Sequence, residues 1–211
     1  MLIAGLTGPI ASGKSTVEKF IQEQGIPVLD ADKVVYKLYQ KGSPIVQNLS
    51  HLCGQSITDI HGNVDRTKLS ELVRKDSHLL KNIEEIVHPA VRRSIYHWLQ
   101  AEYEKKSTIV VLSIPLMFDA GFHELCDTVI CCIADDKIRK QRFMERPNTT
   151  NSKWEIINSK QLSSKQYAEK SDFIIYTDTE LELTHKETLS IIEKVQCIKP
   201  AAYLKWLKLY L

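Results

Sequence analysis

The sequence predicts an α/β fold with a five-stranded, mainly parallel sheet flanked by helices. Two observations support this prediction. Short apolar runs of strand length recur along the 211 residues, with helical or loop segments between them, and a glycine-rich loop directly follows the first run. This alternation is typical of a parallel sheet that helices cover on both faces. The predicted strands are Leu2 to Leu6, Pro27 to Leu29, Thr108 to Ile114, Thr128 to Ile133 and Phe173 to Tyr176.

The glycine-rich loop carries the clearest functional signal of the chain. Residues 8–15 read Gly-Pro-Ile-Ala-Ser-Gly-Lys-Ser and fit the pattern G-x-x-x-x-G-K-[ST]. A strand, a tight turn and a helix start place backbone N–H groups and the positive end of a helix dipole around one cavity, which suits a polyphosphate. The chain is therefore predicted to have the P-loop NTPase fold. An ordinary glycine-rich turn capped by a serine is the weaker alternative in this context.

Each residue type in the loop has an expected task. Gly8 and Gly13 allow backbone conformations and a close approach that a side chain would block. Lys14 is expected to reach the β- and γ-phosphates of the ligand, and the Ser15 hydroxyl is expected to ligate Mg²⁺. The residues predicted to bind the nucleotide are Gly8, Ala11, Ser12, Gly13, Lys14, Ser15 and Thr16.

Bulk properties exclude several classes of function. The formal net charge of +2 gives no reason to expect nucleic-acid binding, and no apolar run approaches the length of a membrane span. The N-terminal apolar stretch is short and lacks a basic flank, so we expect a cytoplasmic protein. We also expect a monomer or weak homo-oligomer whose partners are small-molecule substrates. The five cysteines lack zinc-ligand spacing and are expected to be reduced thiols, buried where they lie in the run 128–133.

Residues 33–106, between the second and third predicted strands, are expected to form a helical insertion. A first helix is predicted over residues 76–87, with Asp76 or Ser77 as its N-cap. It is expected to end before Pro89, because the residue that precedes a proline avoids helical geometry. A second helix is expected to start after Pro89 and to run to about residue 105. His88 would then lie at a break between helices, where its side chain can point at a ligand.

Residues 143–170 are expected to form a lid over a triphosphate. The wider segment 137–170 carries nine Lys or Arg and three Glu, and its tip at 146–152 is polar and aperiodic. For single residues such as Lys137 and Lys140, a solvated basic helix face is the alternative. The core of this single domain is expected to comprise residues 1–32, 107–142 and 171–211.

Phosphoryl transfer needs a base at the acceptor, a metal ion and cations around the γ-phosphate. The second predicted strand ends in Asp30-Ala31-Asp32, and ligands of open α/β sheets bind beyond the carboxyl ends of strands. Asp32 or Asp30 is therefore a candidate to orient the proton of an acceptor hydroxyl. Lys14, together with Arg142 or Arg146, is a candidate to stabilise phosphate charge. Asp32 has an alternative role as a helix N-cap, which does not exclude catalysis.

Further motifs accompany the loop. They are Asp30-Ala31-Asp32, His88-Pro89, Ile114-Pro115-Leu116-Met117-Phe118-Asp119 and Ser171-Asp172-Phe173-Ile174-Ile175. Together with the run from Leu6 to Thr16, they resemble the dephospho-CoA kinase family, in the family's order, from residue 2 to about residue 178. The loop alone is shared by many nucleotide-binding proteins, whereas this combination is more specific.

The resemblance implies that ATP donates its γ-phosphate to the ribose 3′-hydroxyl of dephospho-CoA, the last step of coenzyme A biosynthesis. By position, Asp32 would activate that hydroxyl, and His88 would lie close to the acceptor. Pro115 and Leu116 would line the site beyond the third strand. Arg142 matches the family's arginine at the start of the lid helix, where it would contact phosphate.

The chain departs from the family pattern at several positions. Pro9 and Ala11 stand where the family usually has glycine, and Pro9 has no backbone N–H, so nucleotide binding requires that this donor be dispensable. Ser113 stands where many members carry Asp. If that Asp orders Mg²⁺ through water, its absence shifts the task to Ser15 and Asp32.

Three alternative functions remain open at this point. Another P-loop nucleoside or small-molecule kinase would share the loop, the lid and the insertion. A nucleotide-dependent switch would typically carry a guanine-selecting Asn-Lys-x-Asp motif, which the sequence lacks. An inactive descendant kept for assembly would have no need of both the intact Gly13-Lys14-Ser15 and Asp32.

Overall fold

The structure is a computed structural model that describes residues 1–54 and 57–210. The chain divides into two compact units. The first unit comprises Met1–Leu29 and Glu102–Leu211, and the second comprises Asp30–Ala101. The second unit covers most of the stretch predicted as an insertion.

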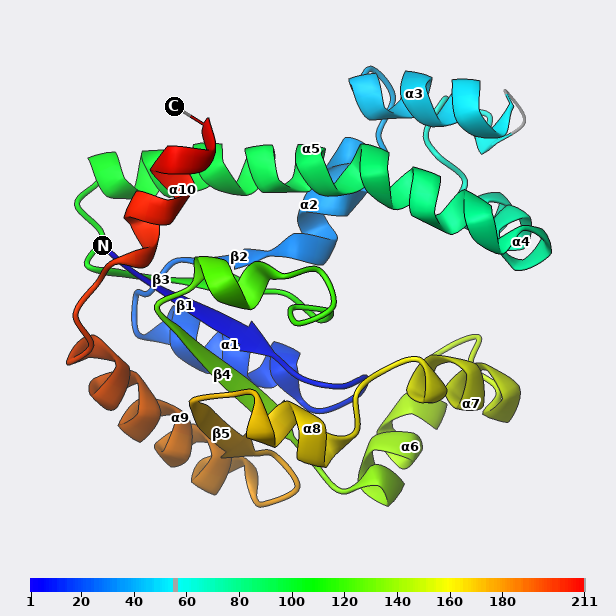
Figure 1. The fold of residues 1–211 in the computed structure, drawn as a ribbon. Helices are drawn as coiled ribbons and strands as arrows, with labels where there is room; N and C mark the ends of the chain where they lie inside the picture. Colours follow the sequence, from blue (N-terminus) through cyan, green and yellow to red (C-terminus); the bar gives the residue numbers. More distant parts are fainter. Residues whose placement is uncertain (55–56, 211) are drawn as a thin grey trace. The chain divides into compact units, whose positions relative to one another are not determined.

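Five parallel strands form the sheet of the first unit (Figure 1). They are β1 (Leu2–Thr7), β2 (Val28–Asp30), β3 (Ile109–Ser113), β4 (Thr128–Ile133) and β5 (Phe173–Tyr176). Their order is β2-β3-β1-β4-β5, so β1 lies in the middle, with Leu2 opposite Ile109 of β3 and Ala4 opposite Thr128 of β4. The predicted α/β fold with a five-stranded parallel sheet is confirmed.

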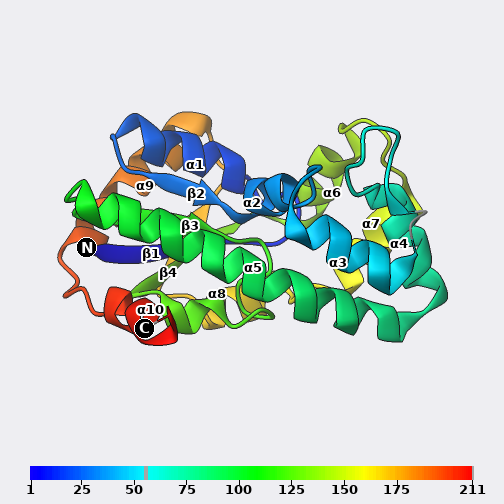
Figure 2. The same ribbon diagram turned by 90° about the horizontal axis from the view of Figure 1, so that it is seen from above.

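Helices cover both faces of this sheet (Figure 2). The helices of the first unit are α1 (Lys14–Glu23), α6 (Asp136–Met144), α7 (Asn151–Ser159), α8 (Ser164–Glu169), α9 (Leu181–Gln196) and α10 (Ala202–Tyr210). Helices α1 and α9 pack on each other on one face, whereas α8 contacts β4 and α10 contacts β1 on the other. Strands β1 and β4 are buried along their whole length, as expected for strands covered on both sides.

The main apolar core lies between the sheet and the helices α1 and α9. Val17 and Ile21 of α1 are buried at helical spacing, against Leu6 of β1 and Val195 of α9. Each such side chain contributes about 1.5 to 3 kcal/mol relative to an exposed position. Helix α1 ends at Glu23, and the chain then turns through Gly25 at a φ of 73°, which a residue with a side chain rarely adopts.

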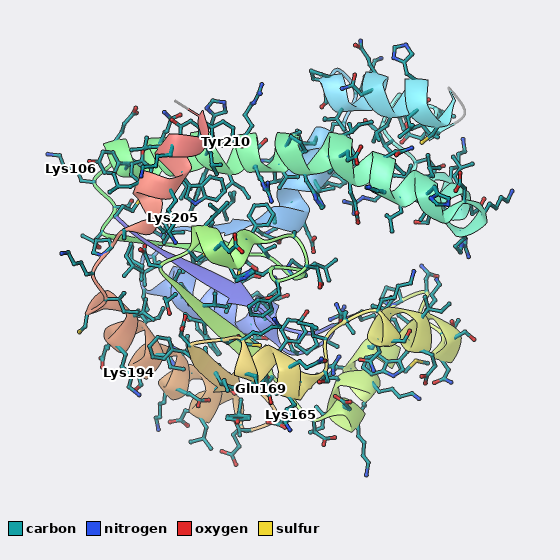
Figure 3. All side chains as sticks on the ribbon, in the orientation of Figure 1. Lys106, Lys165, Glu169, Lys194, Lys205 and Tyr210 are labelled. Atoms are coloured by element: carbon teal, nitrogen blue, oxygen red, sulfur yellow. The ribbon has the colours of Figure 1, made fainter. Side chains whose placement is uncertain are left out.

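The C-terminal helix α10 is fixed to the sheet by a buried aromatic side chain and by polar contacts. Trp206 is fully buried, and its indole N–H donates to the carbonyl of Leu125 at 2.9 Å. The ammonium of Lys205, labelled in Figure 3, donates to the carbonyl of Glu124 at 2.8 Å. The carboxylate of Asp127 accepts two backbone N–H groups at the start of the helix, at 2.6 and 2.7 Å. The bonds to Glu124 and Leu125 hold the helix on the short 3₁₀ helix Phe122–Leu125, and those to Asp127 hold it on the residue that precedes β4.

Among the residues that the structure describes, the second unit contains four α-helical segments. They are α2 (Ala31–Leu38), α3 (Pro44–Cys53), α4 (Arg66–Lys75) and the larger part of α5 (Ser77–Glu104). The side chains of Asp30, Ser43 and Asp65 cap α2, α3 and α4 by accepting backbone N–H groups of the first turn. Pro44 occupies the first position of α3, where its missing N–H costs nothing.

The continuous helix α5 replaces the two helices predicted around Pro89. It runs through Pro89 without a break, so the predicted break at His88 is wrong. Proline inside a helix removes one hydrogen bond and crowds the carbonyl four residues earlier. Buried apolar side chains continue at helical spacing on both sides of Pro89, and their packing offsets this local cost. They are Ile83, Val87, Val91 and Ile95.

The five cysteines are free thiols that differ in burial. Burial raises the pKa of Cys126 and Cys131 to about 12, and raises the pKa of Cys132 well above its ordinary value. Cys197 is exposed and Cys53 is half-buried. We expect an alkylating reagent at pH 8 to modify Cys197 first and to spare the three buried thiols, because the thiolate is the reactive form. Peptide mass spectrometry with and without denaturant checks this expectation, and rapid labelling of Cys131 in the folded protein would contradict it.

Candidate active site

The loop between β1 and α1 depends on two glycines with positive φ. Gly8 has a φ of 152° and Gly13 a φ of 82°. A Cβ on Gly8 would lie 2.4 Å from the carbonyl oxygen of Cys132, and one on Gly13 would lie 2.8 Å from the side chain of Thr177. No side chain fits at either position, so the two predicted glycine roles have a steric basis. Helix α1 begins directly after Gly13 without a side-chain cap, as suits a helix start that receives an anion.

Ala11 adopts a left-handed conformation in this loop, with a φ of 61°. That conformation costs a residue with a side chain about 1 to 2 kcal/mol. The methyl group of Ala11 is buried against Phe143 and Trp154, so packing offsets the backbone strain. Pro9, which has no N–H to offer, contributes its carbonyl oxygen, which accepts the N–H of Ser12 at 3.1 Å.

Lys14, the first residue of α1, contacts two buried polar residues, Glu18 of the same helix and Ser113 at the end of β3. Its Nζ is 2.7 Å from Oε1 of Glu18 and also contacts the hydroxyl of Ser113, and that hydroxyl donates to Glu18. The side chains of Lys14 and Glu18 are only 15% and 11% exposed. Sequence reasoning missed Glu18. Its only signal was a spacing of four residues from Lys14, which many surface pairs share.

Arg142 is connected to the loop through Thr177. Its guanidinium donates to the carbonyl of Thr177 at 2.6 Å and to the hydroxyl at 3.2 Å. The same hydroxyl donates to the carbonyl of Ser12 at 2.7 Å. Arg142, a predicted site residue, is therefore linked to the backbone of the loop through a single bridging residue, Thr177. Thr177 follows β5, and no sequence motif marked it.

Residue Ile10 of the loop is held by the segment that contains α6 and α7. Its N–H donates to Oε1 of Gln161 at 2.8 Å, and its carbonyl accepts from Nε of Arg139 at 3.0 Å. Arg139 is buried, pairs with Asp136 at 2.7 Å and lies 5.4 Å from the ring centre of Trp154. Sequence reasoning considered the neighbouring lysines as lid cations and missed Arg139, because a pattern of charges does not show which long side chain turns inward.

Pro115 and Leu116 follow the end of β3 after one intervening residue, Ile114. The carbonyl of Pro115 accepts the hydroxyl of Thr7 at 3.1 Å and the hydroxyl of Tyr167 at 3.3 Å. Because Thr7 ends β1, these bonds place Pro115 beside the strand from which the loop starts. Leu116 is exposed at the same edge. The structure therefore brings these two residues to the sheet edge that carries the loop.

Asp32 and His88 belong to the second unit. Asp30 caps helix α2, since its Oδ1 accepts the N–H of Asp32 at 2.9 Å. The capping role considered for Asp32 thus falls to Asp30, and the carboxylate of Asp32 is exposed in the first turn. His88 is half-buried in the continuous helix α5.

The sequence was also compared with known families. A family model described as dephospho-CoA kinase (CoaE) matches residues 2–182. The chain belongs to the dephospho-CoA kinase family. A dephospho-CoA kinase of Bartonella quintana (strain Toulouse) is 39% identical over 195 residues, which is 92% of this chain and 98% of that protein. A dephospho-CoA kinase of Fusobacterium nucleatum is 33% identical, also over 195 residues, which is 92% of this chain and 99% of that protein.

Solved structures agree with the fold of the dephospho-CoA kinase family. The crystal structure of TT1252 from Thermus thermophilus has a TM-score of 0.79 at 27% identity, over 92% of this chain and 96% of that one. A dephospho-CoA kinase from Campylobacter jejuni has a TM-score of 0.69 at 22% identity, over the same shares of the two chains. Membership of the family makes the chain a kinase for the ATP-dependent phosphorylation of dephospho-CoA, and the alternative functions are not favoured.

Proposed function

We propose that residues 8–16 bind ATP and that Asp32 activates the ribose 3′-hydroxyl of dephospho-CoA for attack on the γ-phosphate. The reaction class follows from membership of the family, whereas the tasks of single residues are the proposal. One observation carries it. Lys14 opens an uncapped helix, behind a loop whose two glycines leave no room for side chains.

Lys14 and Arg142 would provide the positive charge for the transfer. A lysine ammonium has three N–H donors. Within the described residues, Glu18 and Ser113 accept two of the three N–H donors of Lys14, so one donor is left for a phosphate oxygen. Arg142 adds a cation one residue from the loop. Donors and charges fixed before the reaction stabilise the charge of the transition state without reorganisation.

Mg²⁺ would enter this site together with ATP. Among the described residues, no group of three or more His, Cys, Asp or Glu side chains is arranged to hold a metal ion. Mg²⁺ commonly takes one or two protein oxygens, with substrate phosphates and waters as its other ligands. The exposed hydroxyl of Ser15, in the first turn of α1, is a hard oxygen ligand of this kind. When bound, the ion neutralises charge on the phosphates.

The acceptor would contact Asp32, His88, Pro115 and Leu116. Support for Asp32 comes from chain order, because it follows β2 by two residues and ligands bind beyond strand ends in such sheets. Pro115 and Leu116 lie at the same edge as the loop. Residues 33–106 would hold the acceptor, and residues 143–170 would form the lid.

We also propose a cytoplasmic monomer or weak homo-oligomer with no nucleic-acid partner. The near-neutral net charge of +2 supports the absence of nucleic acid. In the part of the chain that the structure describes, no helix is both long and apolar enough to cross a membrane.

An acceptor panel tests the proposed function. ADP release from Mg-ATP is measured with dephospho-CoA, adenosine, nucleoside monophosphates or no acceptor, and the product is analysed by ³¹P NMR. We expect turnover only with dephospho-CoA, with the new phosphate on the ribose 3′-oxygen. Turnover with another acceptor alone would contradict the acceptor assignment. Hydrolysis that does not depend on an acceptor, or no ADP release at all, would contradict the transfer reaction.

A further inference from the structure

We propose that Glu18 is a positioning residue for phosphoryl transfer, whose carboxylate holds the ammonium of Lys14 in place together with the hydroxyl of Ser113. The inference rests on the proposed function of the loop and extends it to a residue outside the loop motif. Its basis is the contact of these three side chains, which come from the start of α1 and the end of β3.

Glu18 lies where helix α1 otherwise buries apolar residues. Its neighbours Val17 and Ile21 are fully buried, and Glu18 itself is buried among them. A carboxylate in such a place costs free energy unless it is paired and hydrogen-bonded. Glu18 meets this condition through Lys14 and Ser113, two residues that lie next to the loop.

Ser113 connects this pair to the sheet. It is the last residue of β3, fully buried, and it lies opposite Leu6 of β1, two residues before Gly8. Its hydroxyl donates to Glu18 and accepts from Lys14. The position of the ammonium is therefore fixed from the strand as well as from the helix.

Ordinary helix pairs of the same spacing differ from this arrangement. Lys165 and Glu169 of α8, both labelled in Figure 3, are separated by 3.9 Å and are 85% and 61% exposed. Exposed pairs of this kind contribute little to the stability of a helix. Lys14 and Glu18 are largely shielded from water and share a third partner, so the carboxylate limits where the flexible lysine side chain can place its charge.

The variant Glu18→Gln tests this role, because it keeps the shape of the side chain and removes the charge. We expect kcat to fall by about tenfold to a hundredfold, since small displacements of a group that contacts the reacting atoms have effects of this size. The KM for dephospho-CoA is expected to stay within about twofold, because Glu18 has no role in holding the acceptor. The control is Glu23→Gln, the same change at an exposed position of the same helix, with kcat within about twofold of the unmodified protein. A purely structural pair would instead lower the melting temperature of Glu18→Gln and leave kcat unchanged, which would overturn the proposal.

A relocated carboxylate gives the second test. Glu18→Ala removes the group, and Ser113→Asp in the same protein returns a carboxylate from the strand side. We expect kcat of the double variant to be at least about tenfold higher than kcat of Glu18→Ala, because Ser113 already contacts the ammonium of Lys14. A folded double variant without recovery would contradict the proposal.

Calorimetric titration with ATP, without any acceptor, is carried out on the same proteins. It is expected to show weaker nucleotide binding in Glu18→Ala than in Glu23→Gln, and a gain in the double variant. Equal affinities in all of them would count against the proposal. Because this readout needs no acceptor, it separates an error about Glu18 from an error about dephospho-CoA.

Discussion

Replacement of Lys14 by alanine is expected to weaken ATP binding and to lower kcat/KM by about a hundredfold to a thousandfold, the range measured when one fixed donor to a developing negative charge is removed. The lysine opens helix α1 and is the one cation of the loop. Its loss removes a positive charge from both the bound nucleotide and the transition state, so affinity and turnover fall together. Steady-state kinetics and calorimetric ATP titration measure the two effects.

The same variant is expected to lose stability. Without Lys14, the carboxylate of Glu18 keeps the Ser113 hydroxyl and loses its charged partner, in a place that is mostly shielded from water. Loss of the charged partner of a buried carboxylate is expected to destabilise the fold by about 1 to 3 kcal/mol. The melting temperature of Lys14→Ala is therefore measured together with its kinetics. The matched control is Lys19→Ala, an exposed lysine of the same helix, which is expected to change neither quantity. Normal kinetics in folded Lys14→Ala would contradict the assignment of the loop.

The parts of the fold predicted correctly from the sequence have local signals. A short apolar run predicts a buried strand wherever it stands, and all five runs became strands of the sheet. The loop pattern is equally local, because the glycines, Lys14 and the helix start are neighbours in the chain. The steric reason for each glycine comes instead from distant residues, Cys132 for Gly8 and Thr177 for Gly13.

The parts that sequence reasoning missed depend on contacts between distant segments. Glu18 meets Ser113 across 95 residues, Arg139 meets Ile10 across 129, and Thr177 meets Ser12 across 165. No pattern within a short window marks such pairs. Position 113 illustrates this, because the hydroxyl of Ser113 donates to the carboxylate of Glu18 from α1, a partner that the residues around Ser113 do not indicate.

Local rules also failed where packing outweighs them. Pro89 is a helix breaker by its own chemistry, yet the buried stripe on both sides keeps α5 continuous. Ala11 adopts a backbone conformation suited to glycine because its methyl group packs on Phe143 and Trp154. In both cases the free energy gained from tertiary packing exceeds the local cost of the backbone conformation.

Replacement of Asp32 by asparagine is expected to lower kcat by about a hundredfold or more and to leave ATP affinity nearly unchanged. Asparagine has the size of aspartate and still forms hydrogen bonds, but it cannot take the proton of an acceptor hydroxyl, and positioned general bases contribute on this scale. Nucleotide binding is expected to persist because the proposed phosphate contacts come from the loop and not from Asp32. The acceptor-dependent rate and a calorimetric ATP titration measure the two quantities separately.

Asp30 provides the matched control, two residues earlier in the chain. Its Oδ1 accepts the N–H of Asp32 at 2.9 Å, and its Oδ2 lies 3.9 Å from Nζ of Lys33, so its carboxylate is engaged in the start of α2. Asparagine caps helices as well as aspartate does, and Asp30→Asn is therefore expected to keep the helix and most of the turnover. A large loss in Asp32→Asn alone would assign the base to Asp32. A large loss in Asp30→Asn with normal turnover in Asp32→Asn would move the base to Asp30 and give the cap a catalytic role.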